Sequence, residues 1–154
     1  MTSQAPGSLR LNDQLCFGLY SASRALTSLY RVLLEPLDLT YPQYLVMLAL
    51  WEHDARQVKE LGAALNLDSG TLSPLLKRLE KAGLVTRERQ ADDERSVRIT
   101  LTERGAALRG QAEQIPSHIG RALGFDAATA TRLRESLDRL AESVNGYRDD
   151  ITES

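Results

Sequence analysis

The chain has 154 residues, which suits one domain or one protomer of an oligomer. Apolar residues make up 42% and charged residues 26%, a composition that predicts a folded core and excludes a disordered tail. Lys and Arg number 19 against 21 Asp and Glu, a net charge of −2. This balance excludes a generally basic nucleic-acid coat protein and a polybasic membrane binder, but it permits a local basic patch.

A first helix is predicted from residue 12 to residue 34, because apolar residues recur there at three- and four-residue steps. Its leucines are Leu15, Leu19, Leu26, Leu29 and Leu33. We expect Asn12 or Asp13 to cap its start. The helix should end at Glu35, since a proline pushes the residue before it out of the helical region.

A second helix is predicted after Thr40, with Pro42 in its first turn and Gln43 three residues after the cap. A short helix over 58–65 and a tight turn should lead into a helix over 71–81, which Gly83 ends. Pro74 fits that helix best if it starts late, because a proline inside a helix distorts the preceding turn.

After Gly83 the apolar period changes from that of a helix to that of a strand. Residues 84–89, a polar turn over 90–94 and an inward face of Val97, Ile99 and Leu101 predict a β-hairpin. Another helix should open at 102–105 and be interrupted over 116–124. The last helix is predicted over 126–147, with an apolar stripe of Leu133, Leu137, Leu140 and Val144.

The order helix, short helix, turn, helix, hairpin is that of a winged helix-turn-helix, so we predict a mainly α fold with a small β-hairpin. The charge distribution agrees. From Ser69 to Arg89 there are five basic and two acidic residues, a local charge of +3, whereas residues 105–154 hold six basic and eight acidic residues. An ordinary solvated surface also carries basic residues. The order of elements and the local charge together favour DNA binding.

The candidate DNA-binding residues differ in the contact that each can make. Short polar side chains at the front of the helix, Ser69, Thr71 and Ser73, suit base edges in a major groove. Lys77 and Arg78, further along, suit phosphates. Arg95 at the hairpin tip can enter a minor groove or pair with Asp92 or Asp93 to shape the loop. The full set is Ser69, Thr71, Ser73, Lys77, Arg78, Arg87, Asp93 and Arg95.

Three segments resemble the MarR family of bacterial transcription regulators: residues 61–65 (LGAAL), 75–85 (LLKRLEKAGLV) and 92–97 (DDERSV). The stretch from Asp93 to Ser96 is typical of that family's wing, and the resemblance covers roughly residues 11–147. It implies a homodimer that reads a palindromic operator in double-stranded DNA. It also implies three parts: an arm and first dimerisation helix (1–39), a winged helix-turn-helix domain (40–104) and C-terminal dimerisation helices (105–154).

The physics of the helices agrees with a dimer. The apolar stripes of the first and last helices have no obvious partner in so small a chain, and a long exposed apolar seam indicates an interaction surface. A two-fold dimer would read half-sites about one helical turn of DNA apart, ~34–36 Å.

Cys16 is the one cysteine of the chain, and two interpretations of it are open. It could be a small inert core residue, since Leu15 and Phe17 flank it. Alternatively, a place in the first turn of a helix, where free N–H groups point, favours the reactive thiolate. Tyrosine hydroxyls could donate to that thiolate, and Tyr20, Tyr30, Tyr41 and Tyr44 fall in one stretch.

Helix geometry separates these tyrosines. Tyr20 lies one turn from Cys16. Tyr30 lies 14 residues after Cys16, about 21 Å along a straight helix, so it could reach only the Cys16 of a dimer partner. This arrangement resembles the organic hydroperoxide sensors of the MarR family, whose partner-subunit tyrosines match Tyr30 and Tyr41. A second cysteine is absent, so the chain resembles the one-cysteine type, in which a small cellular thiol caps the oxidised sulfur or over-oxidation follows.

We therefore expect a dimeric repressor that senses organic hydroperoxides through Cys16 and releases its operator. Two alternatives stay open. One is a MarR-type regulator released by a non-covalent phenolic or aromatic ligand. The other is a one-cysteine thiol peroxidase, which is disfavoured because the middle third of the chain reads as a DNA-binding element and no alternating β-α pattern is present. We do not expect an enzyme.

The cellular location and the absence of a metal are inferred from features that the sequence lacks. No apolar run approaches the ~20 residues that cross a bilayer, and residues 1–7 lack the pattern of a signal peptide. We expect a cytoplasmic protein without a membrane partner. One cysteine excludes a disulfide within the chain and argues against a cysteine zinc site. His53 and His118 are far apart in the sequence, so we expect no metal and no cofactor.

Overall fold

The computed structural model describes residues 7–90 and 93–154, without the side chains of residues 93–95. The chain forms two compact units that divide between Glu113 and Gln114. Helices dominate both units, and the sheet is small and antiparallel. The predicted fold class, mainly α with a winged helix-turn-helix, is confirmed.

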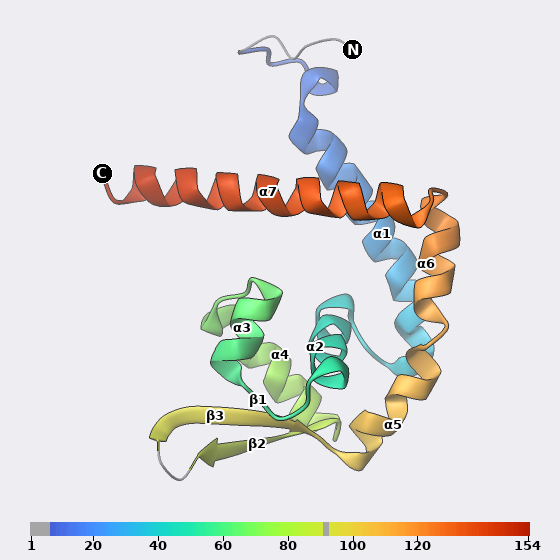
Figure 1. Cartoon of the computed structure of the whole chain (residues 1–154), viewed down its shortest axis with the longest axis vertical. Coiled ribbons are helices and arrows are strands. Elements are labelled where there is room, and N and C mark those ends of the chain that lie inside the picture. Colours follow the sequence, from blue (N-terminus) through green and yellow to red (C-terminus); the bar gives the residue numbers. More distant parts are fainter. Residues whose placement is uncertain (1–6, 91–92) are drawn as a thin grey trace. The chain divides into compact units, whose positions relative to one another are not determined.

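The first unit contains the helix-turn-helix and the wing (Figure 1). Its elements are the 3-10 helix η1 (Leu11–Asp13), α1 (Leu15–Leu34), the 3-10 helix η2 (Glu35–Leu37), α2 (Tyr41–Glu52), β1 (Arg56–Gln57), α3 (Val58–Leu65), α4 (Ser69–Lys81), β2 (Val85–Gln90), β3 (Asp93–Leu101) and α5 (Glu103–Ala112).

The start of α1 differs from the prediction. Asn12 and Asp13 lie in η1, and the residue that precedes α1 is Gln14, whose side chain makes no capping hydrogen bond. Neither predicted cap is correct, because the chain first makes a separate 3-10 turn. Cys16 is therefore the second residue of α1 and remains in its first turn, as expected.

The start of α2 is as predicted. The Thr40 hydroxyl accepts a hydrogen bond from the Gln43 amide at 3.4 Å, and the Thr40 amide donates to Gln43 Oε1 at 2.9 Å. This reciprocal pair, a capping box, satisfies two backbone donors that a helix start leaves unpaired. It fixes the start of the helix that carries Tyr41 and Tyr44.

The start of α4 is a correction. Asp68 caps the helix, which begins at Ser69, two residues earlier than predicted, and Pro74 lies inside it. Proline has no N–H to give to the carbonyl one turn before, so the helix forms against a local penalty. Four buried leucines hold it in place: Leu72, Leu75, Leu76 and Leu79.

The predicted hairpin is confirmed, and the sheet has one strand more. β2 and β3 pair antiparallel from Val85 opposite Leu101 to Arg89 opposite Val97, with a register shift after Arg89. The unpredicted strand β1 joins the other edge of β3, giving the order β1-β3-β2 (Figure 1). A strand of two residues is too short to show an alternating pattern in the sequence.

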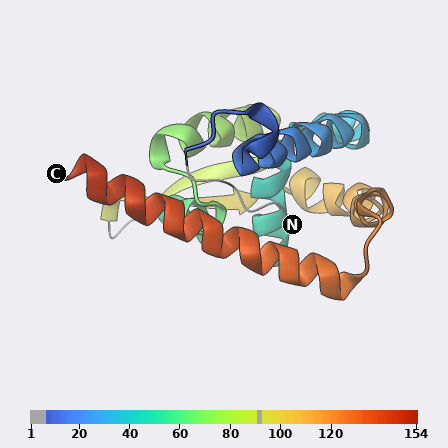
Figure 2. The ribbon, with the colours of Figure 1, turned by 90° about the horizontal axis from the view of Figure 1, so that it is seen from above.

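The second unit contains α6 (Ile115–Leu123) and α7 (Ala127–Thr152). The interruption predicted over 116–124 is wrong, because α6 occupies most of it. The breaks lie at residues 113–114 and at Gly124, whose φ of 73° ends α6. Figure 2 shows α7 as one continuous helix. It buries no residue and exposes an apolar set: Leu133, Leu137, Val144, Tyr147 and Ile151.

Among the described residues, no helix combines the length and the apolar character that crossing a bilayer requires.

Candidate DNA-binding surface and redox site

The front of α4 presents polar side chains to solvent. Ser69 and Thr71 are exposed and Ser73 is half-buried, while the leucines of α4 face the core. Lys77 and Arg78 are exposed further along the helix. The helix thus has one buried apolar side and one free polar side, as a helix that enters a DNA groove requires.

Asp68 positions this front turn. Hydrogen bonds from Thr71, from its side chain and from its backbone amide at 2.7 Å, lower the pKa of the Asp68 carboxyl. Asp68 is therefore an anion at neutral pH that caps the positive end of α4. The sequence pattern placed this position only in the tight turn before the helix, although an aspartate before a helix is a recognised capping signal.

The structure brings three of the predicted DNA-binding residues together and separates a fourth. Ser69, Ser73 and Arg87 line one hollow of about 450 Å³ beside the wing. Arg78 lines a different hollow, of about 690 Å³, with Arg31. Sequence reasoning missed Lys59 and Ser96, which share the first hollow. Ser96 closes the wing motif that begins at Asp93, which could have indicated it, whereas no sequence signal marked Lys59 on α3.

The wing carries the two remaining predicted residues. Asp93 and Arg95 belong to the first part of β3. Their side chains lie outside the described residues, so their part in DNA binding stays a prediction.

Cys16 is exposed on the surface of the chain. Its neighbours Leu15 and Phe17 are exposed as well, at 59% and 43%. Cys16 is therefore not a core residue of the single chain.

The tyrosines form a cluster at the other end of α1. The Tyr30 and Tyr41 ring centroids are 4.4 Å apart, and Tyr44 lies 5.8 Å from Tyr30. Because Cys16 and Tyr30 are separated by 14 residues of one continuous helix, about 21 Å, the cluster cannot reach the Cys16 of its own chain. Tyr30 and Tyr41 are thus together, as an interaction with a partner's cysteine requires.

The cluster extends along α2 to Trp51, for which the sequence predicted no role in the site. Buried Tyr44 meets Trp51 edge-on, with centroids 6.4 Å apart. The Trp51 indole N–H donates to the Gly105 carbonyl at 2.9 Å. The aromatic cluster is therefore anchored to the first turn of α5, directly after the wing.

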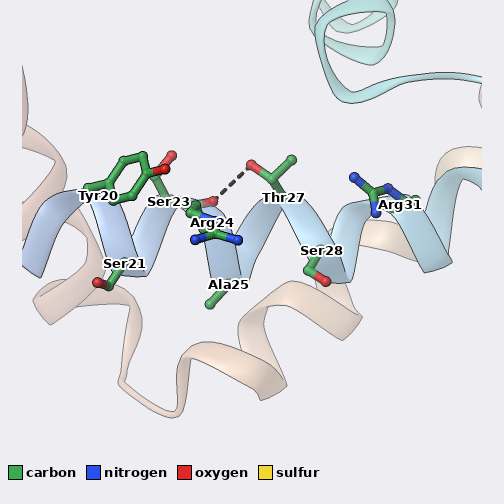
Figure 3. A pocket seen from close by; sticks show the side chains of 8 residues that line it. All are labelled: Tyr20, Ser21, Ser23, Arg24, Ala25, Thr27, Ser28 and Arg31. Atoms are coloured by element: carbon green, nitrogen blue, oxygen red, sulfur yellow. Dashed lines mark hydrogen bonds between the residues drawn. The ribbon is translucent and has the colours of Figure 1, made fainter.

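Tyr20 has a different setting from the other predicted sensor residues. It is 60% exposed, and the Arg24 guanidinium lies 5.6 Å from its ring centroid. Figure 3 shows that these side chains and the small residues Ser21, Ala25 and Ser28 belong to one helix, α1, and line a shallow hollow. Small residues on an exposed helix face leave room for close approach of another helix.

Tyr30 holds its proton far above neutral pH. Burial and the neighbouring Tyr41 and Tyr44 raise the pKa of Tyr30 to about 12. An unfolded tyrosine loses its proton at roughly pH 10, so the stabilisation linked to protonated Tyr30 is complete below roughly pH 10. It is lost as the pH rises toward about 12.

In an alkaline titration followed by phenolate absorbance, Tyr30→Phe should remove the part of the absorbance rise that wild type shows near pH 12. The same substitution should leave the absorbance at lower pH unchanged. A variant whose titration curve loses amplitude evenly at all pH values would contradict the assignment.

Among the described residues, no group of three or more His, Cys, Asp or Glu side chains could hold a metal ion.

A helix-turn-helix beside an antiparallel wing, with polar and basic side chains on its free side, defines a winged-helix DNA-binding regulator. Comparisons with known proteins agree. A family model described as transcriptional regulator SarA/Rot matches residues 28–109. The organic hydroperoxide resistance transcriptional regulator of Bacillus subtilis (strain 168) is 50% identical over 140 residues, which cover 89% of this chain and 93% of the relative.

Two solved structures of AbfR, a protein of Staphylococcus epidermidis, are similar. Reduced AbfR bound to DNA has a TM-score of 0.75 at 37% identity, covering 88% of this chain and 95% of that one. Overoxidized AbfR bound to DNA has a TM-score of 0.74 at 38% identity, covering 88% and 96%. The chain belongs to the MarR family of transcriptional regulators, in its organic hydroperoxide subgroup. The resemblance seen in the sequence is confirmed.

Proposed function

We propose that this protein is a homodimeric repressor that leaves its operator when an organic hydroperoxide oxidises Cys16. One observation carries the proposal: the single cysteine is exposed in the first turn of α1, and the Tyr30 and Tyr41 rings lie against each other at the other end. Two copies with antiparallel first helices would bring each cysteine to the other copy's tyrosines. Hydroxyl donors there would stabilise the thiolate.

The chemistry needs only the hydroperoxide and a thiol. The Cys16 thiolate attacks the terminal peroxide oxygen, the O–O bond breaks, and an S–O bond forms. The alkoxide leaves and takes a proton, so the peroxide is reduced to an alcohol and sulfur is oxidised to a sulfenic acid. A small cellular thiol then forms a disulfide with Cys16 and releases water. The added group strains the contacts beside Tyr30 and Tyr41, which biases the dimer away from its DNA-binding geometry.

The dimer rests on exposed apolar side chains of two helices. α1 exposes Leu15, Phe17 and Tyr20, and α7 exposes the apolar set given above. We assign residues 1–39 and 105–154 to dimerisation and residues 40–104 to DNA binding. Two such domains would read a palindromic operator, with Ser69, Thr71 and Ser73 at base edges and Lys77, Arg78 and Arg95 at the backbone or minor groove.

A second candidate function has one observation in its favour. The hollow that holds Arg31 and Arg78 is also lined by the apolar residues Val32 and Leu39. Glu35 and Asp38 line it as well and balance the two cations, so its apolar side chains suit a neutral phenolic or aromatic ligand, the inducer in the alternative regulator. In that case Cys16 would have no part in release.

The deciding experiment uses reduced wild-type protein and a duplex that this protein has selected from a random-sequence pool. We expect one equivalent of cumene hydroperoxide per protomer, with a small thiol present, to release the duplex in a gel shift. Retained binding would contradict the proposal. Consumption of many equivalents of peroxide per protomer without release would instead identify a thiol peroxidase.

A further inference from the structure

A hollow of about 450 Å³ lies where α3, α4 and the wing meet. Its lining includes Lys59 from α3, Ser69 and Ser73 from α4, Arg87 from β2 and Ser96 from β3. We propose that this hollow binds one phosphate group, and that the group is a backbone phosphate of the operator. The inference rests on the proposed function, and it adds Lys59 and Ser96 to the DNA-binding residues.

The charge of the hollow suits an anion. Lys59 and Arg87 contribute two cations from different elements, and among the side chains that the structure describes no carboxylate lines the hollow. Within the described part of the chain, the one ion pair joins Arg148 to Asp149, so neither cation is neutralised by a carboxylate there. Two cations that face one hollow repel each other, and a bound anion relieves this repulsion.

Two acidic residues at the starts of α3 and α4 are engaged elsewhere. Asp68 Oδ1 accepts the Thr71 amide at 2.7 Å, and Glu60 Oε2 accepts the Gln57 amide at 3.4 Å. Each carboxylate thus caps its own helix. They reduce the positive potential but do not occupy the hollow.

The hydrogen-bond donors of the hollow suit phosphate oxygens. Three serines contribute hydroxyl groups, and α3 and α4 both begin at the hollow, so their positive ends lie close to it. Ser96 Oγ is buried and makes no hydrogen bond within the described residues. A buried hydroxyl without a partner is costly, so this atom adds a reason for a ligand.

The hollow also lies where the backbone of bound DNA is expected to pass. Ser69 and Ser73 belong to the front of α4, where contacts to the phosphate would replace the base-edge contacts expected for them, and Arg87 belongs to the wing strand. A strand of DNA that passes between a recognition helix and a wing brings its backbone to this junction. The volume exceeds the need of a single phosphate ion, which leaves room for the sugars on either side.

The test is the salt dependence of duplex affinity for wild type, Lys59→Gln and Arg87→Gln, with Arg109→Gln on α5 as the control for loss of one charge from the same unit. We expect the slope of log affinity against log salt to fall by about one unit in each hollow variant. Arg109→Gln should keep the wild-type slope. Ser96→Ala should weaken binding without changing the slope, because it removes a neutral donor.

Inorganic phosphate distinguishes the two sources of the group. We expect phosphate, at matched ionic strength, to shift the Ser69 and Ser96 amide NMR signals in wild type but not in Lys59→Gln. If phosphate binds while both hollow variants keep the wild-type DNA slope, the site takes a free ion and the operator assignment is wrong. If neither phosphate nor DNA responds to the variants, the hollow is no phosphate site.

The inference can fail separately from the proposed function. Backbone contacts do not depend on base sequence, so a random duplex reports on the hollow as well as a selected one does. If the hollow variants lower the salt slope but wild type does not release DNA in peroxide, the phosphate site is supported and the peroxide-sensor proposal is contradicted. A wild-type chain that binds no duplex would contradict both.

Discussion

The Cys16→Ser variant should bind the selected duplex as reduced wild type does and remain bound in cumene hydroperoxide. A serine hydroxyl is not ionised at neutral pH and cannot attack the O–O bond. The change is one atom at an exposed position, so stability should stay within about 0.5 kcal/mol of wild type. In the gel shift, wild type should lose at least about tenfold in affinity on oxidation, roughly 1.4 kcal/mol, and the variant none.

Two tyrosine variants test the second part of the proposed sensor site. Tyr30→Phe and Tyr41→Phe keep the rings, whose centroids are 4.4 Å apart, and remove only the hydroxyl groups. We expect both to bind DNA normally when reduced and to respond to peroxide more slowly than wild type. Release of Cys16→Ser by peroxide at the wild-type rate would end the sensor proposal and favour the non-covalent inducer.

The Gly105→Ala variant should lose about 3 kcal/mol of unfolding free energy, through overpacking of a close contact. A Cβ at Gly105 would collide with the Leu84 carbonyl oxygen and lie 3.3 Å from Leu101 Cδ2. A backbone carbonyl has nowhere to move, because the Leu84 oxygen also accepts the Thr102 amide. For a chain of this size the loss lowers Tm by roughly 10 °C.

Gly110→Ala is the control in the same helix. Nothing lies within 4 Å of a Cβ added there, so alanine should stabilise α5 by about 0.5–1 kcal/mol. Urea unfolding of both variants gives the comparison. Equal stabilities of the two would show that α5 does not pack on the wing as closely as the structure has it.

Gly105 also links the wing to the aromatic cluster. Its carbonyl accepts the Trp51 indole, and its amide donates to the Thr102 hydroxyl at 3.0 Å. Displacing α5 should therefore disturb the Tyr44–Trp51 contact as well. Tryptophan fluorescence of Gly105→Ala would report that change directly.

Local signals in the sequence predicted the elements well where a cap or a period was complete. The helix at Val58–Leu65 and the capping box at Thr40 are as predicted. The predicted boundaries were wrong where tertiary packing outweighed a local preference of the backbone. Pro74 argued for a late start of α4, but the buried leucines around it outweigh the missing hydrogen bond.

The sequence by itself determined the family, the winged helix-turn-helix, the single cysteine and the spacing that separates Cys16 from Tyr30, because each of these depends on residue types and their positions along the chain. Only the tertiary structure decided which side chains meet. It placed Tyr44 and Trp51 beside the tyrosine pair, and it parted Arg78 from Arg87. Such meetings depend on how α2, α3, α4 and the wing pack, and packing between distant segments leaves no period in the sequence.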